Sequence, residues 1–268
     1  MDPGVTLLQK DRLLLFAGPC VVEGRDITLR IAERLKEITA KRPITFVFKA
    51  SFDKANRTSK DSFRGHDEAL KILEEVRTKV GVPVNTDVHE SGQVEAVAQA
   101  VDTLEIAERV SRENDLVLAE GATGKPVLLK KGQFMAPEDM RHAVAKVKEG
   151  GAGGRESEVF LCERGTSFGY QNLVVDFRSL PIMRTFAPVV FDGTHSVQRP
   201  AAKGDRSGGD REMIPHLVRA AAAVGIDGLF LECHENPDKA LCDGPNQLRL
   251  DDLAALLDTV TALRSHAP

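Results

Sequence analysis

The chain has 268 residues, and its 36 Lys and Arg against 40 Asp and Glu give a formal net charge of −4. Hydrophobic residues at 42% and charged residues at 28% exclude a disordered chain and supply ample material for a core. The mild acidity and sparse aromatic residues argue against nucleic acid as a partner, and no apolar run approaches the ~18 residues of a membrane span.

Short apolar runs recur along the chain, and amphipathic segments that predict helices lie between most of them. In chain order the predicted elements are strand Leu13–Ala17, helix Ile27–Ile38, strand Ile44–Lys49, helix Asp67–Val80, strand Val82–Asp87, helix Glu95–Ala100, strand Val101–Ile106, helix Ala107–Ala119, strand Pro126–Lys130, helix Pro137–Glu149, strand Val159–Cys162, strand Pro188–Phe191, helix Glu212–Ala223, strand Asp227–Glu232 and helix Leu250–Arg264. Two glycine-rich pieces, Gly150–Gly154 and Lys203–Gly209, predict loops.

The alternation of strands and helices predicts an α/β fold with a parallel sheet. The strands are continuous Val/Ile/Leu-rich runs, as expected when both faces of a sheet are buried. Eight repeats in about 250 residues favour one (β/α)₈ TIM barrel over a doubly wound sheet. No linker or low-complexity segment divides the chain, so residues 1–268 are predicted to form a single catalytic domain.

The N-terminus and the cysteines indicate the compartment. The first residues lack the basic segment and apolar core of a signal peptide. The four cysteines form no CxxC pair, so we expect thiols rather than a disulfide framework. Among them, Cys162 and Cys233 are expected in the core. The predicted location is the cytoplasm.

Reactive residues collect where the predicted strands end, and in a barrel this face carries the active site. One set is cationic: Lys49, Lys54, Arg57, Arg64, Lys131 and Arg164. Converging Lys and Arg side chains in an acidic protein predict one or two phosphorylated or carboxylated small substrates. A solvated rim of charges is the alternative. It is less favoured for Lys49 and Lys131, because both emerge from buried strands, where lysine needs a partner.

A second set resembles a metal site: Cys20, His195, Glu232 and Asp243. One thiolate, one imidazole and two carboxylates could hold Zn²⁺, Fe²⁺ or Mn²⁺. The barrel would bring these residues together from its first, seventh and eighth strands. A Cys20–His195 nucleophile pair is an alternative. It ranks lower because the surrounding cations suit phosphate better than acyl transfer.

Several stretches are similar to the metal-dependent 3-deoxy-D-manno-octulosonate 8-phosphate synthase family. They cover nearly the whole chain in the right order: residues 17–23 (AGPCVVE), 46–59 (FVFKASFDKANRTS), 86–90 (TDVHE), 130–134 (KKGQF), 163–170 (ERGTSFGY), 192–198 (DGTHSVQ) and 238–245 (DKALCDGP). The second stretch is close to that family's most specific motif.

The resemblance implies a homotetrameric (β/α)₈ enzyme, with a homodimer as the other possibility. Such an enzyme condenses phosphoenolpyruvate with the phosphorylated aldose D-arabinose 5-phosphate and releases inorganic phosphate. Its product leads to KDO and lipopolysaccharide biosynthesis. Cys20 stands where the metal-independent branch has Asn, so the resemblance also implies dependence on a divalent metal ion.

The same resemblance assigns roles to single residues. Those implied to hold phosphoenolpyruvate and act in catalysis are Lys49, Lys54, Lys131 and Arg164, together with His195. The implied metal ligands are Cys20, His195, Glu232 and Asp243. The aldose phosphate would be held by Asn56, Arg57, Thr58 and Ser59, and the rest of the expected substrate-binding set is Arg64, Glu105, Arg112, Gln133 and Asp192.

One region departs from the family. Residues 105–115 read EIAERVSREND instead of QIPAFLCRQTD, and residues 127–131 read VLLKK instead of VNVKK. Glu105 would place an anion beside an anionic substrate, which weakens binding unless a cation such as Arg109 compensates. This departure leaves two alternatives open. The enzyme could take a different aldehyde acceptor, for example in secondary metabolism, or the chain could be a non-catalytic sugar-phosphate binder or a subunit of a mixed oligomer.

Overall fold

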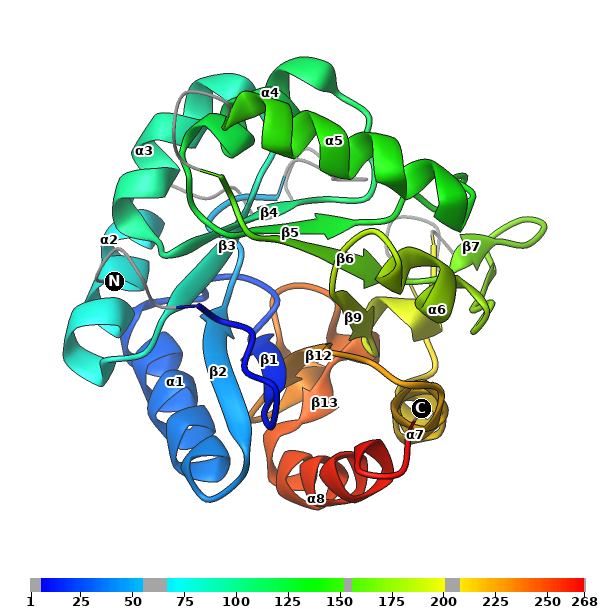
Figure 1. The fold of residues 1–268 in the computed structure, drawn as a ribbon. Coiled ribbons are helices and arrows are strands. Elements are labelled where there is room, and N and C mark those ends of the chain that lie inside the picture. The colour runs from blue at the N-terminus through cyan, green and yellow to red at the C-terminus, as the bar shows by residue number, and fades with distance from the viewer. Residues whose placement is uncertain (1–5, 55–66, 152–155, 201–207, 268) are drawn as a thin grey trace.

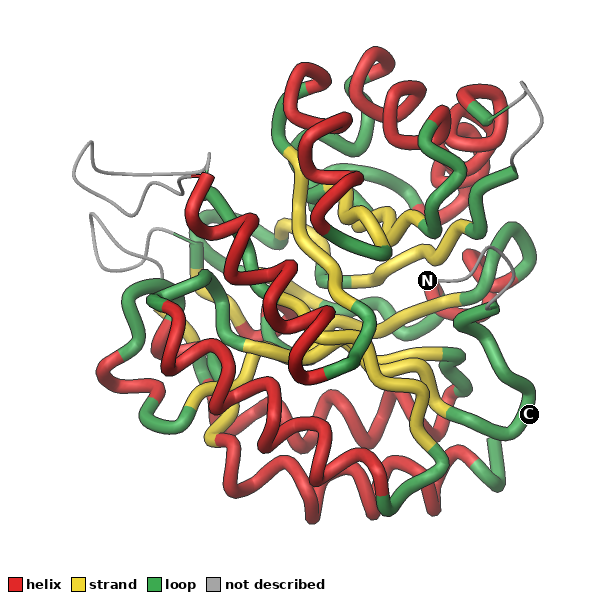
Figure 2. The backbone as a smooth tube through the Cα atoms, turned by 90° about the vertical axis from the view of Figure 1, so that its left-hand side faces the viewer, coloured by secondary structure: helices red, strands yellow, loops and turns green. Residues whose placement is uncertain are grey.

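The computed structural model describes residues 6–54, 67–151, 156–200 and 208–267. Eight parallel strands pair in the order β1-β2-β3-β4-β5-β6-β9-β12, and β1 also pairs with β12, so the sheet closes into a barrel. Helices lie outside the sheet in both views (Figures 1 and 2). The predicted (β/α)₈ TIM barrel is confirmed.

The barrel strands lie close to the predicted ranges. They are β1 (Leu13–Gly18), β2 (Ile44–Lys49), β3 (Val84–Val88), β4 (Thr103–Ile106), β5 (Val127–Lys130), β6 (Val159–Glu163), β9 (Val189–Asp192) and β12 (Gly228–His234). Short extra strands decorate the barrel: β13 (Leu248–Arg249) beside β12, the hairpin β7 (Thr166–Ser167) with β8 (Leu173–Val174), and the pair β10 (Gln198–Arg199) with β11 (Gly208–Gly209). The loop prediction for Lys203–Gly209 is therefore wrong at its described end, because the two glycines pair as β11.

The helices are α1 (Arg25–Ala40), α2 (Asp67–Glu75), α3 (Val94–Ala100), α4 (Asn114–Ala122), α5 (Met140–Gly150), α6 (Ser179–Arg184), α7 (Ile214–Val224) and α8 (Leu253–Arg264), and α2 continues as a π-helix over Val76–Val80. In Figure 1, α4 and α5 lie together on one side of the barrel. No helix in the described part of the chain is long and apolar enough to cross a membrane.

Two helix predictions need correction. The helix predicted from Ala107 begins only at Asn114. Residues 107–113 form turns instead, closed by hydrogen bonds from Val110 N–H to the Ala107 carbonyl (3.1 Å) and from Glu113 N–H to the Val110 carbonyl (2.9 Å). The second error is α6, which was not predicted because it is a six-residue helix with a proline inside it.

The barrel interior explains where the site lies. Alternate residues of the strands point inward and form an apolar cluster of Leu14, Phe16, Val47, Leu128, Phe160, Cys162, Val190 and Phe230, which Leu7 joins from the N-terminal segment. Since side chains alternate with a period of two, the next inward positions are Lys49, Lys130, Asp192 and Glu232. A buried charged layer therefore rests on an apolar floor, at the carboxyl ends of the strands.

Candidate active site

Seven barrel strands each bring a charged residue to the same end of the barrel. These residues are Lys49, Asp87, Glu105, Lys130, Glu163, Asp192 and Glu232, and all of them are buried. Ion pairs connect the layer: Lys49 Nζ lies 3.7 Å from carboxylate oxygens of both Asp87 and Glu232, and Lys131 Nζ lies 3.6 Å from Glu163 Oε2. Buried charges need such partners.

The four predicted metal ligands come together at this end. His195 Nε2 lies 3.7 Å from Glu232 Oε1 and 4.0 Å from Asp243 Oδ2, and Cys20 Sγ lies 3.7 Å from the same Asp243 oxygen. One ion bound at ~2.0–2.3 Å by tetrahedral ligands would separate them by about 3.3–3.8 Å. Neither carboxylate oxygen of the buried Glu232 accepts a hydrogen bond within the described residues. The donor set therefore fits a divalent cation.

Asp192 orients the imidazole of His195. The carboxylate can only accept, so the 2.7 Å contact between His195 Nδ1 and Asp192 Oδ2 places the proton on Nδ1. Nε2 is then left as a lone-pair donor facing Glu232 and Asp243, which is how metal-binding histidines are commonly held. Burial acts to raise the pKa of Asp192, but His195 and Lys130 outweigh it and hold that pKa well below its usual range.

The loop after β1 carries Cys20 close to β2. A Cβ on Gly18 would lie 1.9 Å from the Lys49 carbonyl oxygen, so only glycine permits this approach. The Cys20 carbonyl then accepts a hydrogen bond from Ser51 N–H at 3.1 Å. Burial, reinforced by the neighbouring Cys242, raises the pKa of the Cys20 thiol.

Cys242 is a site residue that was not predicted. Its Sγ and the donor atoms of Cys20 and Asp243 all lie within 4.8 Å of one another. Asp243 has a left-handed backbone conformation, with φ of 47°. Cys242 stands next to Asp243 in a chain with only four cysteines, and this position was a signal that could have revealed it.

Lys130 compensates the unusual carboxylate of Glu105. Its Nζ lies 3.2 Å from Glu105 Oε1, 2.9 Å from Asp192 Oδ2, and 3.6 Å from the centre of the Phe230 ring. Burial acts to lower the pKa of Lys130, but the two carboxylates outweigh it and raise that pKa, so the ammonium stays charged. Arg109, the expected compensating cation, is exposed instead. Lys130 was not in the predicted site set, although its inward position follows from the strand period.

An anion-binding corner lies beside this layer. The Arg164 side chain is 1% exposed, and one guanidinium nitrogen donates to Gln198 Oε1 at 3.0 Å. Its Nε and other terminal nitrogen have no hydrogen-bond partner within the described residues. Lys131 Nζ donates to Thr166 Oγ1 at 3.1 Å, and half-buried Gln133 contacts Ser167 at 3.3 Å. Buried, unsatisfied donors next to a buried ammonium favour a carboxylate or phosphate.

His89 and Lys54 line the site on the β3 side. His89 Nε2 lies 3.4 Å from Asp87 Oδ2, and its ring stacks near Phe52. Lys54 is charged here: burial acts to lower its pKa, but Cys20, Asp87 and Glu232 raise it. Asp87 and His89 stood in a matching motif without being assigned a role.

Six predicted residues are not placed in this site: five lie outside the described part of the chain, and one lies elsewhere on the surface. Asn56, Arg57, Thr58, Ser59 and Arg64 lie outside the described residues. Arg112 is exposed and lines a separate hollow of about 290 Å³ near Phe134 and Lys146.

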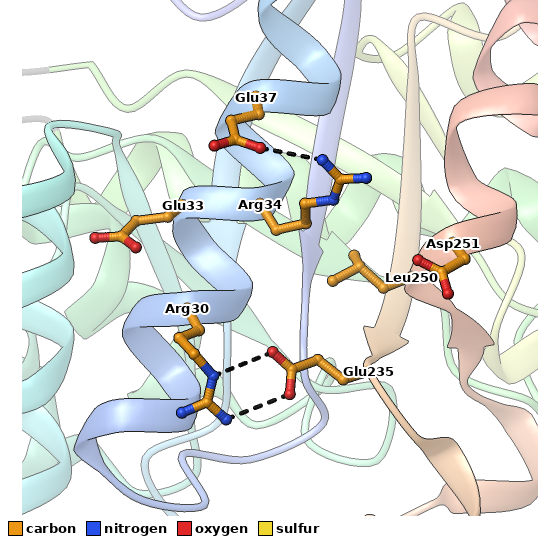
Figure 3. A pocket seen from close by; sticks show the side chains of 7 residues that line it. All are labelled: Arg30, Glu33, Arg34, Glu37, Glu235, Leu250 and Asp251. Atoms are coloured by element: carbon orange, nitrogen blue, oxygen red, sulfur yellow. Dashed lines mark hydrogen bonds and ion pairs between the residues drawn. The ribbon is translucent and has the colours of Figure 1, made fainter.

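A second surface hollow, of about 360 Å³, lies between α1 and the segment after β12 (Figure 3). Its charges are largely paired: Arg30 contacts Glu235 at 3.3 Å, and Arg34 contacts Glu37 at 3.1 Å. Such exposed pairs neutralise one another and offer no unsatisfied donors comparable with those of Arg164. The hollow is therefore not the candidate site.

Sequence comparisons with known proteins identify the family of this chain. The sequence pattern of the DAHP synthetase I family matches residues 4–267. A 2-dehydro-3-deoxyphosphooctonate aldolase of Synechococcus sp. is 56% identical over 255 residues, covering 94% of this chain and 88% of the relative. Proteins of the same name from Cyanothece sp. and Bordetella petrii are 51% identical over 268 residues and 55% over 254, covering 99% and 93% of this chain and 97% and 89% of the relatives.

Proposed function

This chain belongs to the DAHP synthetase I family, and we propose that it condenses phosphoenolpyruvate with D-arabinose 5-phosphate. The products are 3-deoxy-D-manno-octulosonate 8-phosphate, which leads to lipopolysaccharide, and inorganic phosphate. The relatives' name denotes an enzyme of the same eight-carbon deoxy acid phosphate. The observation that carries the proposal is the buried Arg164 guanidinium, with two unpartnered nitrogens, in the same charged layer as the metal-type donors.

The reaction joins two anions. Carbon 3 of the enol phosphate attacks the aldehyde carbon of the aldose and forms the new carbon–carbon bond. Water adds at carbon 2, and phosphate leaves from that carbon. Both substrates carry phosphate, so they repel one another. A site with several fixed cations offsets this repulsion and turns a two-body collision into a positioned reaction.

The chain's own residues can do most of this work. Arg164 and Lys131 would hold the phosphoenolpyruvate anion, because their donors lie buried in one corner of the site. Lys49 stays charged between Asp87 and Glu232: burial acts to lower its pKa, but Asp87 and Glu105 outweigh it. A buried ammonium of this kind stabilises negative charge that develops in the transition state.

A divalent ion would be held by Cys20, His195, Glu232 and Asp243. When bound, Zn²⁺, Fe²⁺ or Mn²⁺ would supply Lewis-acid polarisation of an oxygen at the reacting centre. Asp192 keeps His195 in the tautomer that such a site requires.

The Lys130–Glu105 ion pair bears on the acceptor. The sequence leaves a different aldehyde open because Glu105 adds an anion to the site. Lys130 lies 3.2 Å from that anion and offsets its charge within the protein. The local charge is therefore compensated without a new kind of substrate, which supports arabinose 5-phosphate as the acceptor.

We also propose a homotetramer in the cytoplasm. Phe134, Phe168 and Tyr170 are 63%, 69% and 99% exposed, and the last two lie in or next to the β7–β8 hairpin that extends from the barrel in Figure 1. Exposed aromatic side chains of this kind favour a contact between subunits. All four cysteines are free thiols, which suits a reducing compartment. Sedimentation equilibrium tests the tetramer, and a monomer would contradict it.

The function is tested by phosphate release from phosphoenolpyruvate with added divalent metal. Arabinose 5-phosphate, erythrose 4-phosphate, ribose 5-phosphate and no acceptor are compared, each with and without chelator. We expect release only with arabinose 5-phosphate, and loss of release with chelator. Arg164→Ala should abolish turnover, whereas the matched control Lys148→Ala, on the exposed face of α5, should retain it. Release with another acceptor, or no release with any acceptor, would overturn the proposal.

A further inference from the structure

We propose that Cys242 supplies a second sulfur donor to the metal centre, in addition to Cys20, His195, Glu232 and Asp243. The inference rests on the metal site of the proposed function, but it concerns which residues bind the ion and not which sugar reacts. It goes beyond the four ligands that the family resemblance implies.

Two groups of donors share Asp243: one with Cys20 and Cys242, and one with His195 and Glu232. Within each group the donor atoms lie within 4.8 Å of one another. Cys242 therefore belongs to the same donor cluster as Cys20 and Asp243, within a limit about 1 Å wider than the ~3.3–3.8 Å that separates tetrahedral ligands of one ion. An ion seated at Asp243 would have both sulfurs within reach after small side-chain rotations.

Hydrogen bonds fix the backbone on both sides of Cys242. The buried Gln247 donates from Nε2 to the Cys242 carbonyl at 2.8 Å. On the other side, Leu241 N–H donates to Glu23 Oε1 at 3.2 Å, and Glu23 also lies 3.5 Å from His234. The segment is therefore tied to the β1 loop and to the end of β12, the two elements that carry Cys20 and Glu232. The Cys242 thiol therefore lies on a fixed segment of backbone next to the site and not on a flexible turn.

Thiolates are soft ligands that select Zn²⁺ and similar ions over Mn²⁺ and Mg²⁺, which prefer oxygen donors. A second thiolate would shift the preference of this centre further toward thiophilic metals. The ammonium of Lys54 lies near both sulfurs and offsets the added negative charge. The predicted result is a centre with a strong bias for Zn²⁺ over Mn²⁺.

The test is Co²⁺ substitution of the metal-free full-length protein under reducing conditions. Each thiolate bound to Co²⁺ contributes charge-transfer absorbance in the near ultraviolet. Wild type, Cys242→Ser, Cys20→Ser and the double variant are compared at saturating Co²⁺. We expect each single variant to lose about half of the band and the double variant to lose all of it. Cys233→Ala is the matched control, because that thiol packs among the outer core residues.

Metal competition gives a second readout that does not depend on turnover. In Cys242→Ser, affinity for Zn²⁺ should fall at least about tenfold, the lower end of the cost of losing a group that only supports a ligand. Affinity for Mn²⁺ should change little. Circular dichroism of Cys242→Ser and Cys242→Ala verifies the fold. If Cys242→Ser keeps the full band and the Zn²⁺ affinity while Cys20→Ser loses the whole band, Cys242 is not a ligand. That outcome leaves the phosphate-release result untouched, so the two proposals fail separately.

Discussion

Asp192→Asn removes one charge from the buried layer without changing the shape of the side chain. Asp192 is 0% exposed and accepts four hydrogen bonds. Oδ2 accepts from His195 Nδ1 at 2.7 Å and Lys130 Nζ at 2.9 Å, and Oδ1 accepts from the N–H groups of Thr194 and His195 at 3.0 and 2.8 Å. The asparagine amide keeps one acceptor oxygen and turns an NH₂ group toward donors. At least two of these bonds are therefore lost.

The size of the effect follows from those contacts. Bonds to charged groups contribute about 1.5–3 kcal/mol each, so losing those of Lys130 and His195 costs about 3–6 kcal/mol. Removing one partner of a buried ion pair costs about 3–5 kcal/mol, which agrees with the cost of the two lost hydrogen bonds. We therefore expect the free energy of unfolding to fall by about 3–5 kcal/mol. Metal affinity should fall about 10–100-fold, because nothing then fixes the His195 tautomer.

The assay is urea unfolding of both proteins in chelator, so that bound metal does not contribute, followed by metal competition. Asp258→Asn serves as the control, since Asp258 is 63% exposed and its 2.7 Å pair with Arg42 should contribute less than about 1 kcal/mol. The pH dependence has a definite sign. The folded-state pKa of Asp192 is lowered, so its contribution is complete above the unfolded carboxyl pKa of about 4 and declines as the pH falls below it.

Two results would refute this reasoning. If Asp192→Asn costs no more stability than Asp258→Asn, the buried contacts do not carry the energy assigned to them. If stability falls but metal affinity does not, Asp192 supports the barrel and has no role in orienting His195.

Four further changes test other parts of the structure. Glu120→Leu should raise the free energy of unfolding at pH 8 by about 1–3 kcal/mol, because within the described residues neither oxygen of this buried carboxyl has a hydrogen-bond partner. Burial raises the pKa of Glu120, so wild type loses stability as the pH rises above the ordinary carboxyl range, and the gain in urea unfolding should shrink toward pH 4; a pH-independent gain would contradict this. Lys131→Ala should weaken phosphoenolpyruvate binding by about 1.5–3 kcal/mol in calorimetry, and unchanged affinity would remove Lys131 from the site. Cys20→Asn should lower metal content by elemental analysis, and parental stoichiometry with parental chelator sensitivity would show the ligand assignment to be wrong. Gly18→Ala should lower stability by about 1–3 kcal/mol in thermal unfolding, because the added Cβ meets the backbone of Lys49. An unchanged melting temperature would show that β1 can move away.

The fold and much of the site were predictable because their signals are local. A buried parallel strand is a continuous apolar run, and the residue that ends it lies at the catalytic face of a barrel. Lys49, Asp192 and Glu232 follow from that rule alone. Cys20 and His195 follow from the same rule, because they lie in the loops after two strand ends. The structure brings these residues together, and their roles remain proposals for the experiments above.

Other features could not be predicted from the sequence pattern. The turns at 107–113 have an amphipathic pattern that also suits a helix, and hydrogen bonds within the loop decide against it. The compensation of Glu105 is another case. Arg109 is near in sequence, but the pairing of β4 with β5 puts Lys130 on the inward face two residues beyond the partner of Glu105. Distance along the sequence does not reveal this ion pair, because strand register and barrel closure determine which side chains meet.

The sequence by itself determined the order of strands and helices, the apolar floor of the barrel and which residue types end each strand, because side-chain hydrophobicity and a period of two are encoded residue by residue. Only the tertiary structure decided which charges pair. Closure of β1 onto β12 puts the loop of Cys20 beside Asp243, and it sets Cys242 within reach of both. Residues more than 200 positions apart become neighbours through the closed sheet, and no local sequence pattern shows that they are close in space.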